Sequence, residues 1–428
     1  MVLGSGVASL DATVVNVALP RLGSDLHADF ASLQWVLNGY TLSLASLILV
    51  GGALGDRLGR RKVFTIGVIW FAAASLLCGL APDVRTLIAA RILQGIGGAL
   101  LTPGSLSILQ ASLRPEDRAR AIGAWSGLGG VTTAIGPFLG GWLVDVASWR
   151  LIFLLNLPLA AVVVYVATRH VPETRDPTVS GRLDYSGALL GALGLAATTY
   201  GLIERSWAIG AVGIVGLAVF VLVESREQHP MLPLGIFRSQ QFSATNVVTF
   251  FVYGGLSSSL FLLGLVLQIG LGYSPLEAGV SMFPITVIML LFSARAGALA
   301  QRIGPRLPMT LGPAMVAGGM VLMIRITPGV NNAVARVGGL LAVAAVPLVA
   351  GINPAQGVAA TTLVSGFHAT MVAAAGLVLT GALVAFALIR SDVLAVSTSD
   401  DAAPVEHRNP CFHCGVGGPP LRVHASSG

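Results

Sequence analysis

The stretch GGALGDRLGRRKVF, residues 51–64, gathers charge in a chain that otherwise has little. Only 10% of the 428 residues are charged, yet five fall within seven positions here: Asp56, Arg57, Arg60, Arg61 and Lys62. The stretch also contains glycines 52, 55 and 59, and it is flanked by long runs with almost no charge. This pattern is typical of a short polar connector between two apolar helices.

The composition excludes a water-soluble domain. The chain is 54% hydrophobic, has a mean hydropathy of +0.82 and contains 53 glycines. A soluble domain carries roughly 25% charged residues because its surface must be solvated. We therefore expect an integral membrane protein.

About thirteen apolar runs follow one another along the chain. Most are close to the roughly 20 residues that a helix needs to cross the hydrocarbon core. Outer-membrane strands would be about 10 residues long with alternating polarity, so the runs predict helices. The expected spans lie near 1–20, 33–54, 63–81, 87–110, 121–147, 151–168, 184–204, 207–224, 243–269, 276–299, 308–326, 333–351 and 367–390.

The distribution of arginine predicts the orientation. The connectors after the second, fourth, sixth, eighth and tenth spans each hold two to four basic residues, and the intervening ones hold only Arg21, Arg85, Arg150 and Arg205. The positive-inside rule then places the amino terminus and the 55–62 connector in the cytoplasm. The basic residues form no continuous face, which argues against a nucleic-acid partner despite the net charge of +6.

Two ionisable residues lie inside the first four spans. Asp11 falls in the first span, followed by Asn16, and Arg91 falls in the fourth, three positions before Gln94. An intramembrane charge is costly and needs a partner, and Asp11 is the only acid deep in these spans, so we expect the two to pair. In the alternative, Asp11 lies near an interface and Arg91 extends from its helix end to water.

The fifth span contains GLGGVTTAIGPFLGGWL, residues 127–143. Glycines at 123 and 127, and again at 136 and 140, create faces on which another helix can approach closely. Pro137 removes one backbone hydrogen bond and permits a kink. By themselves these features indicate only close helix packing.

Together the motifs resemble the major facilitator superfamily. GALGDRLGRRKVF (52–64) resembles its signature between the second and third spans, RILQGIGGA (91–99) its fourth-span motif and TAIGPFLGG (133–141) its antiporter motif. LDATVVNVALP (10–20), WRLIFLLNLPL (149–159) and RLDYSGALLG (182–191) are similar to the fourteen-span branch of drug–proton antiporters. The resemblance covers nearly all of residues 1–390 and implies two helical bundles with two extra central helices.

The resemblance also implies roles for individual residues. Asp11 would be the proton acceptor or a carboxylate that responds to substrate, with Arg91 as its electrostatic partner. The expected cavity-facing groups are Asn16, Gln94, Trp125 and Asn156. The expected conformational latch comprises Gly52, Asp56, Arg57, Gly59, Arg60 and Arg61. The antiporter-motif helix contributes Gly136, Pro137, Gly140 and Gly141.

The sequence departs from the family pattern in three places. Thr132 stands where the antiporter motif usually has glycine, and SARAGALAQRIGPR (293–306), the second copy of the signature, has Gln301 where the first has Asp56. After residue 326 the pattern predicts that one span is absent, near 326–333. Thirteen spans would leave Arg390 on the outer face, against the positive-inside rule. In the alternative, 308–326 re-enters without spanning.

We therefore expect a bundle over 1–168, two extra helices and connectors over 169–240, and a second bundle over 241–390 that is one helix short. The short bundle should leave an apolar groove and impair transport. The tail, 391–428, is expected to be disordered, because its Cys411 and Cys414 lack the second ligand pair of a structural zinc site.

The expected function is export of amphiphilic small molecules across the cytoplasmic membrane in exchange for protons. The expected partners are substrates, protons and lipids, and no protein partner is inferred. We expect no cofactor or metal, because the proton gradient is the energy source. An enzyme would need a convergent set of reactive groups, and the spans offer none, His368 being single. The alternatives are a proton symporter that imports a metabolite and a membrane sensor that does not transport.

Overall fold

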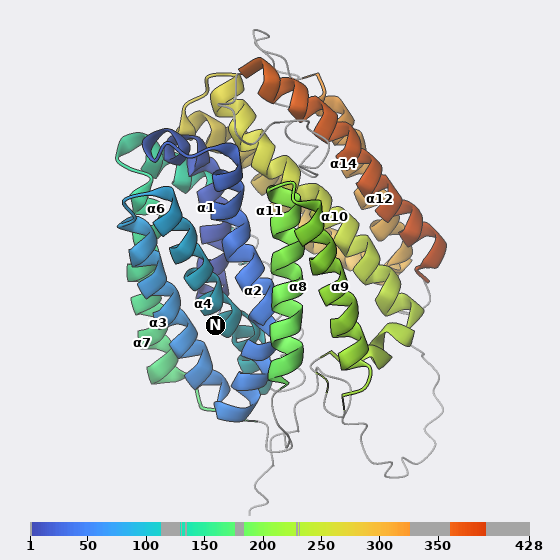
Figure 1. Ribbon diagram of the computed structural model, residues 1–428. Coiled ribbons are helices and arrows are strands. Elements are labelled where there is room, and N and C mark those ends of the chain that lie inside the picture. Colours follow the sequence, from blue (N-terminus) through green and yellow to red (C-terminus); the bar gives the residue numbers. More distant parts are fainter. Residues whose placement is uncertain are drawn as a thin grey trace, which may run out of the picture.

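The computed structural model describes residues 2–112, 129, 131–132, 135–175, 184–227, 230, 232–325 and 360–390 (Figure 1). These residues form helices joined by short connectors, and no strand occurs in this part of the chain. The expected span 333–351, the apparent deletion near 326–333 and the tail 391–428 lie outside it, as does Trp125.

The first half of the chain supplies one bundle. Its helices are α1 (Val2–Asp25), α2 (Phe30–Leu58), α3 (Arg60–Gly79), α4 (Val84–Ser112), the helix Ile135–Val146, α6 (Arg150–Leu154) and α7 (Asn156–His170). The single span expected over 151–168 is divided at Leu155, where α6 ends and α7 begins. Pro158 lies in the first turn of α7, where its missing N–H leaves no helical hydrogen bond unmade.

The second half supplies the remaining helices. These are α8 (Tyr185–Ile203), α9 (Trp207–Glu224), η1 (Leu234–Arg238), α10 (Gln240–Leu265), the π-helical turn η2 (Val266–Gly270), α11 (Pro275–Ile303), α12 (Arg306–Met323) and α14 (Ala360–Leu388). α12 is one uninterrupted helix despite Pro313, so it shows no re-entrant turn.

Side chains in the connectors fix where several helices begin. The Asp29 carboxylate accepts a hydrogen bond from the backbone N–H of Ser32 and caps α2. Asp83 caps α4 by accepting from the backbone N–H and the hydroxyl of Thr86, and these hydrogen bonds lower the pKa of its carboxyl. Ser274 and Glu277 form a reciprocal capping box at the start of α11. The caps therefore lie in the connectors, where backbone groups at helix ends need partners.

Eight helices among the described residues are long and apolar enough to cross a membrane. Many of their large side chains point outward, and α9 shows this most plainly with Val212, Ile214, Val215 and Leu222 each more than half exposed. A helix that is apolar on its outer face as well as its inner one is suited to lipid. The composition-based prediction of a helical membrane protein is confirmed.

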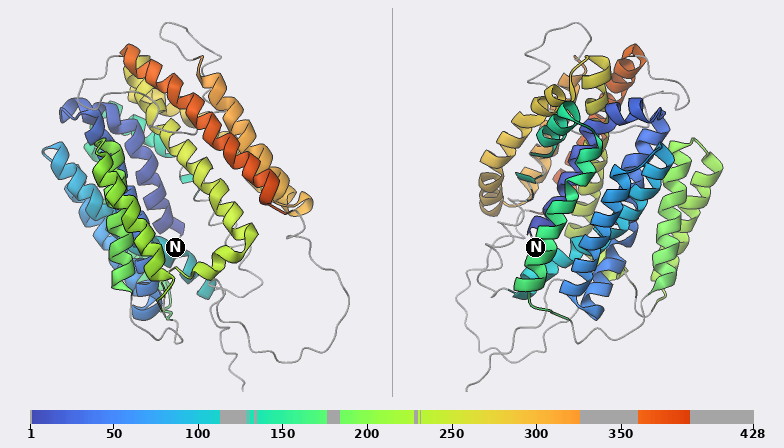
Figure 2. Two further views of the ribbon diagram at one scale, coloured as in Figure 1. Left: turned by 45° about the vertical axis from the view of Figure 1, so that its right-hand side comes forward. Right: turned by 90° about the vertical axis from the view of Figure 1, so that its left-hand side faces the viewer.

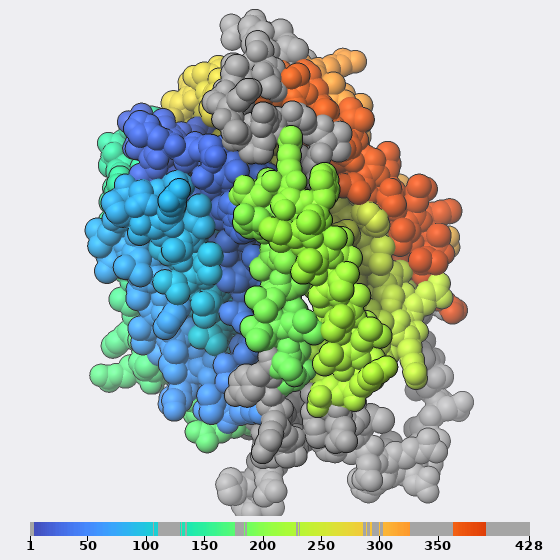
Figure 3. Space-filling view, viewed as in Figure 1, coloured from blue at the N-terminus to red at the C-terminus, as the bar shows by residue number. Residues whose placement is uncertain are grey.

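Helices α8 and α9 form a hairpin on the surface of the molecule (Figure 3). Small residues let the two backbones approach, because a Cβ added to Gly213 would overlap the backbone of Thr198. The hairpin is tied to α2 by a hydrogen bond of 2.9 Å from Trp35 Nε1 to Glu204 Oε1 and by contact between Trp35 and Tyr200. It is thus attached to the first bundle.

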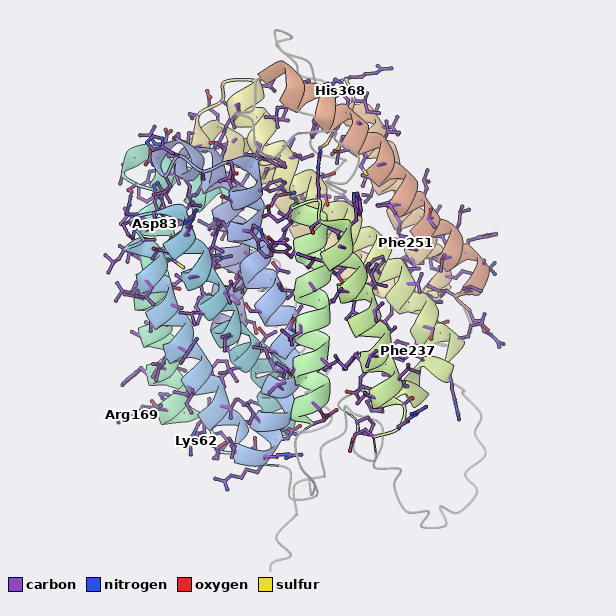
Figure 4. All side chains as sticks on the ribbon, viewed as in Figure 1. Lys62, Asp83, Arg169, Phe237, Phe251 and His368 are labelled. Atoms are coloured by element: carbon purple, nitrogen blue, oxygen red, sulfur yellow. The ribbon has the colours of Figure 1, made fainter. Side chains whose placement is uncertain are left out.

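The two ends of the molecule are chemically different. Lys62 and Arg169 lie at one end and Asp83 at the opposite end (Figure 4). α14 finishes at the end where α10 starts, since Gln240 Nε2 donates to the Leu388 carbonyl and the Arg390 N–H donates to Gln241 Oε1. Phe237, just before α10, lies at the Lys62 end (Figure 4). The end of α14 therefore lies on the same side of the molecule as Lys62 and Arg169, which we call the basic end.

This placement predicts the outcome of cysteine labelling from either side of the membrane. With Cys411 and Cys414 replaced by serine, Lys62→Cys and Arg390→Cys should react with an impermeant maleimide from the same side, and Pro82→Cys from the other. We expect Pro82→Cys to be labelled in intact cells and the other two only in everted vesicles. Labelling of Arg390→Cys together with Pro82→Cys would contradict the placement of α14.

Candidate functional site

A buried ion pair lies inside the first bundle. The Asp11 carboxylate of α1 is 2% exposed, and the Arg91 side chain of α4 is completely buried. Arg91 Nη1 lies 2.5 Å from Asp11 Oδ2. The structure therefore brings together the two charged residues that the sequence predicts as partners, and Arg91 does not extend to water.

Arg91 is held in place by groups other than the carboxylate. Its Nη1 donates to Gln94 Oε1 at 2.6 Å, and its Nε donates to the Val36 carbonyl of α2 at 3.0 Å. The guanidinium also lies over the ring of Tyr40, 4.3 Å from its centroid. Charged, desolvated donors need this many partners, because removing a charge from water is otherwise very costly.

The second oxygen of Asp11 is surrounded by amides. Oδ1 accepts hydrogen bonds of 2.9 Å from Gln94 Nε2 and 2.9 Å from Asn156 Nδ2. The same two nitrogens also donate to Ser75 Oγ, at 2.8 and 3.2 Å. Of the four expected cavity groups, Gln94 and Asn156 belong to this network. Ser75 was not predicted, because a lone serine in an apolar span carries no signal.

Asn16 lies apart from the network. Its Nδ2 donates to the Ala12 carbonyl of its own helix, and its Oδ1 is buried without a partner in the described part of the chain. The Asn16 carbonyl faces Gly264 of α10. Asn16 therefore sits where the two bundles meet, and its cavity role stays a prediction, as does that of Trp125.

The predicted latch residues form a compact charged corner at the basic end. Arg60 binds Asp56 Oδ1 through Nε and Nη2, each at 2.8 Å. Gly59 has a φ of +113°, a conformation that side chains rarely adopt. Gly52 packs against Pro103 of α4, and Arg57 is half-buried in the last turn of α2. The expected pairing of Asp56 with an arginine of the connector is present.

Glu173 completes this corner and was not predicted. Its two carboxylate oxygens accept hydrogen bonds from the backbone N–H groups of Arg61 and Lys62, at 3.0 and 3.1 Å. It also lies 3.7 Å from Arg61 Nε, and a Cβ on Gly59 would come within 2.7 Å of it. A carboxylate at the amino-terminal end of α3 is favoured by the helix dipole, so Glu173 connects the end of α7 to the signature.

The antiporter-motif helix contacts both bundles through its small residues. A Cβ on Gly136 would overlap Thr13 of α1, and one on Gly140 would lie 2.8 Å from a methyl carbon of Val14. On another side, Gly141 abuts the Pro275 carbonyl of α11, and Gly279 of α11 abuts the Pro137 carbonyl. These glycines allow backbones to touch where larger residues would separate them.

The contacts between the bundles gather at the end opposite the basic connectors. Gln268 in the π-helical turn donates to the Val17 carbonyl of α1 at 2.8 Å, close to the contact of Asn16 with Gly264. Toward the basic end, α10, α12 and α14 diverge from the first bundle (Figures 1 and 2). In the described part of the chain, the bundles are therefore in contact at the Asp83 end and diverge toward the other end.

The buried pair predicts a non-additive effect on stability. Arg91→Met leaves the Asp11 carboxylate buried and uncompensated, which should lower the free energy of unfolding by about 3–5 kcal/mol. The double variant Asp11→Leu, Arg91→Met removes both charges and should recover most of the loss. Thermal unfolding of the purified proteins in detergent measures this. A double variant as unstable as Arg91→Met would contradict the pairing.

The glycine contact between the bundles predicts an effect on closure. Gly141→Val should push the Pro275 carbonyl away and open the Asp83 end. Ala278→Cys, buried beside this contact, should then become more reactive toward an impermeant maleimide applied from that side. The matched control is Gly376→Val, where an added Cβ meets open space. Equal labelling in both backgrounds would rule out a closing role for Gly141.

Comparison with known proteins places this arrangement in a family. Residues 1–389 match the Major Facilitator Superfamily pattern. The chain is 34% identical over 327 residues to the tetracenomycin C resistance and export protein of Streptomyces glaucescens, covering 74% of this chain and 61% of that protein. It is 36% identical over 336 residues to multidrug resistance protein Stp of Mycobacterium tuberculosis, covering 75% and 62%. The aligned region thus spans less than two thirds of either relative.

Solved structures agree on the fold. The D-xylose-proton symporter superposes with a TM-score of 0.58 at 14% identity, over 92% of this chain and 97% of that one. The inward-open xylose transporter XylE from E. coli gives a TM-score of 0.58 at 15% identity, over 91% and 94%. At such low identities, these similarities show the fold alone. With the family pattern covering almost the whole chain and the same helical architecture, this protein belongs to the Major Facilitator Superfamily of membrane transporters.

Proposed function

We propose that the chain exports drug-like or amphiphilic small molecules across the cytoplasmic membrane in exchange for protons. The observation that carries the proposal is the Asp11–Arg91 pair. It places a carboxylate, a group that can take up a proton, in the buried interior of the first bundle. Intramembrane carboxylates of this kind mark proton pathways. The substrate class rests on the relatives, which are named for resistance to tetracenomycin C and to multiple drugs.

The pair offers a simple coupling scheme. While Asp11 is ionised, its attraction to Arg91 and the amide hydrogen bonds hold α1, α4 and α7 together. Protonation of Asp11 removes the negative charge and weakens the attraction to Arg91. The weaker attraction changes how tightly the helices of the network are held together. One of them, α1, also contacts α10 through the hydrogen bond from Gln268 to the Val17 carbonyl. Proton binding thereby biases the contact between the bundles.

The latch and the topology belong to the same proposal. The corner of Asp56, Arg60 and Glu173 would hold the basic end in one state of alternating access and rearrange in the other. The amino terminus would be cytoplasmic, because α1 begins in the half of the first bundle whose end carries Lys62 and Arg169 (Figures 1 and 4). The same proposal includes fourteen-span ancestry with one helix lost near 326–333, and this loss should slow export.

The test uses everted vesicles that acidify on energisation, with quenching of an acridine dye as the readout. Amphiphilic antibiotics and dyes chosen from a toxicity panel in a pump-deficient host are then added. Wild-type protein should release protons from the lumen as substrate enters, and Asp11→Asn should not, because it has no carboxylate to titrate. Asp25→Asn, the same change at the exposed end of α1, is the matched control.

The outcomes separate the alternatives. Proton movement with the substrate rather than against it would indicate a symporter. Substrate binding without flux in proteoliposomes would indicate a sensor. Export by Asp11→Asn at the wild-type rate would remove Asp11 from the coupling mechanism.

A further inference from the structure

Asn156 occupies an unusual position within the Asp11 network. It is the first residue of α7, directly after the break at Leu155, and it is only 1% exposed. Both hydrogens of its amide are used, one toward Asp11 Oδ1 at 2.9 Å and one toward Ser75 Oγ at 3.2 Å. Its own Oδ1 is buried and accepts no hydrogen bond in the described part of the chain.

Since Oδ1 accepts no hydrogen bond, only the two hydrogen bonds that the NH₂ donates hold the amide in its present orientation. An amide oxygen and an amide NH₂ have nearly the same size, so rotating the Asn156 amide by half a turn exchanges them without new steric contacts. In the rotated form Oδ1 would face Asp11 and Ser75, and the NH₂ would face the side on which Oδ1 now has no partner. With Asp11 ionised this is unfavourable, because two oxygen acceptors would then face each other.

Protonation of Asp11 reverses that preference. A protonated carboxyl has an O–H donor, and the Ser75 hydroxyl can turn to donate as well as accept. The two lone pairs of Asn156 Oδ1 would then be matched by two donors, just as its two N–H groups are now matched by two acceptors. Each orientation of the amide therefore fits one protonation state of Asp11.

Gln94, the other amide in the network, cannot reverse in this way. Its Oε1 accepts from Arg91 Nη1 at 2.6 Å and from Cys78 Sγ at 3.7 Å, so rotation would turn its NH₂ toward the guanidinium. Gln94 is held by the cation, and Asn156 is not. Asn156 is therefore the amide whose orientation can change when Asp11 is protonated.

Among the described residues, titratable side chains from three helices interact electrostatically with Asp11. They are Tyr40 of α2, Cys78 of α3 and Arg91 of α4. Arg91 is a permanent cation, and neither a phenol nor a thiol takes up a proton near neutral pH. Asp11 is therefore the group of this set whose protonation the Asn156 amide would register.

We propose that the Asn156 side chain reads the protonation state of Asp11, donating to the carboxylate and, after a half-turn, accepting from the carboxylic acid. The inference rests on the proposed function, in which Asp11 carries the transported proton. Asn156 is a positioning residue, and its amide gains and loses no proton. Its rotation keeps Asp11 hydrogen-bonded in both states, so the proton can bind without leaving a polar group of Asp11 unmatched.

Infrared difference spectroscopy tests this directly. Protein carrying ¹³C-labelled asparagine is purified into proteoliposomes, and spectra are compared between alkaline and acidic pH. The carboxylic acid band of Asp11 should appear on acidification, identified by its absence in Asp11→Asn. A labelled asparagine carbonyl band should move to lower frequency in the same step, and this change should be lost in Asn156→Leu but kept in Asn246→Leu, a control on the exposed face of α10.

The results separate the two proposals. If Asp11 gives no acid band, both the coupling mechanism and this inference fail. If the acid band appears and the asparagine carbonyl does not respond, the inference alone is overturned.

Transport supplies a second readout. Asn156→Leu keeps the branched shape of the side chain but removes the amide, so proton-driven export should fall. Asn156→Thr, whose hydroxyl can donate or accept, should restore part of the proton-driven rate. Asn156→Leu that exports like wild type at every pH would contradict the proposed role.

Discussion

The attraction between one carboxylate and one guanidinium, both removed from water, is the interaction on which this structure depends. Asp11 and Arg91 can be buried in an apolar bundle only because each charged side chain also has neutral partners. Among these partners are Gln94, Asn156 and the Val36 carbonyl. A buried pair adds little net stability, since desolvation offsets attraction. In the proposed mechanism, its value is that a proton can switch the charge of one partner.

Close helix packing makes that enclosure possible. A Cβ on Gly51 would overlap the Ala99 carbonyl, and one on Gly97 would lie 2.7 Å from the Phe71 backbone nitrogen, so α4 lies directly against α2 and α3. Such contacts bring Ser75, Gln94 and Tyr40 around the ion pair without space for bulk water. In a bilayer this packing, more than the hydrophobic effect, holds helices together. The glycines therefore help to bury the ion pair, because they let the surrounding helices pack closely.

The sequence predicted the features that leave a local signal. Apolar runs gave the helices, and the pairing of Asp11 with Arg91 followed because no other acid lies deep in the first four spans. Ser75 and the Val36 carbonyl could not be anticipated, because neither a serine in a span nor a backbone carbonyl stands out. Glu173 lies 112 positions from Arg61, and only the fold shows that it caps α3.

The most direct test of the account is the number of protons released when substrate binds to purified protein in weakly buffered detergent, followed with a pH-sensitive dye. If substrate and proton compete through Asp11, wild-type protein should release protons on binding and Asp11→Asn should bind substrate without release. Equal release from both proteins, or none from wild type, would contradict the claim that the Asp11–Arg91 pair couples proton to substrate.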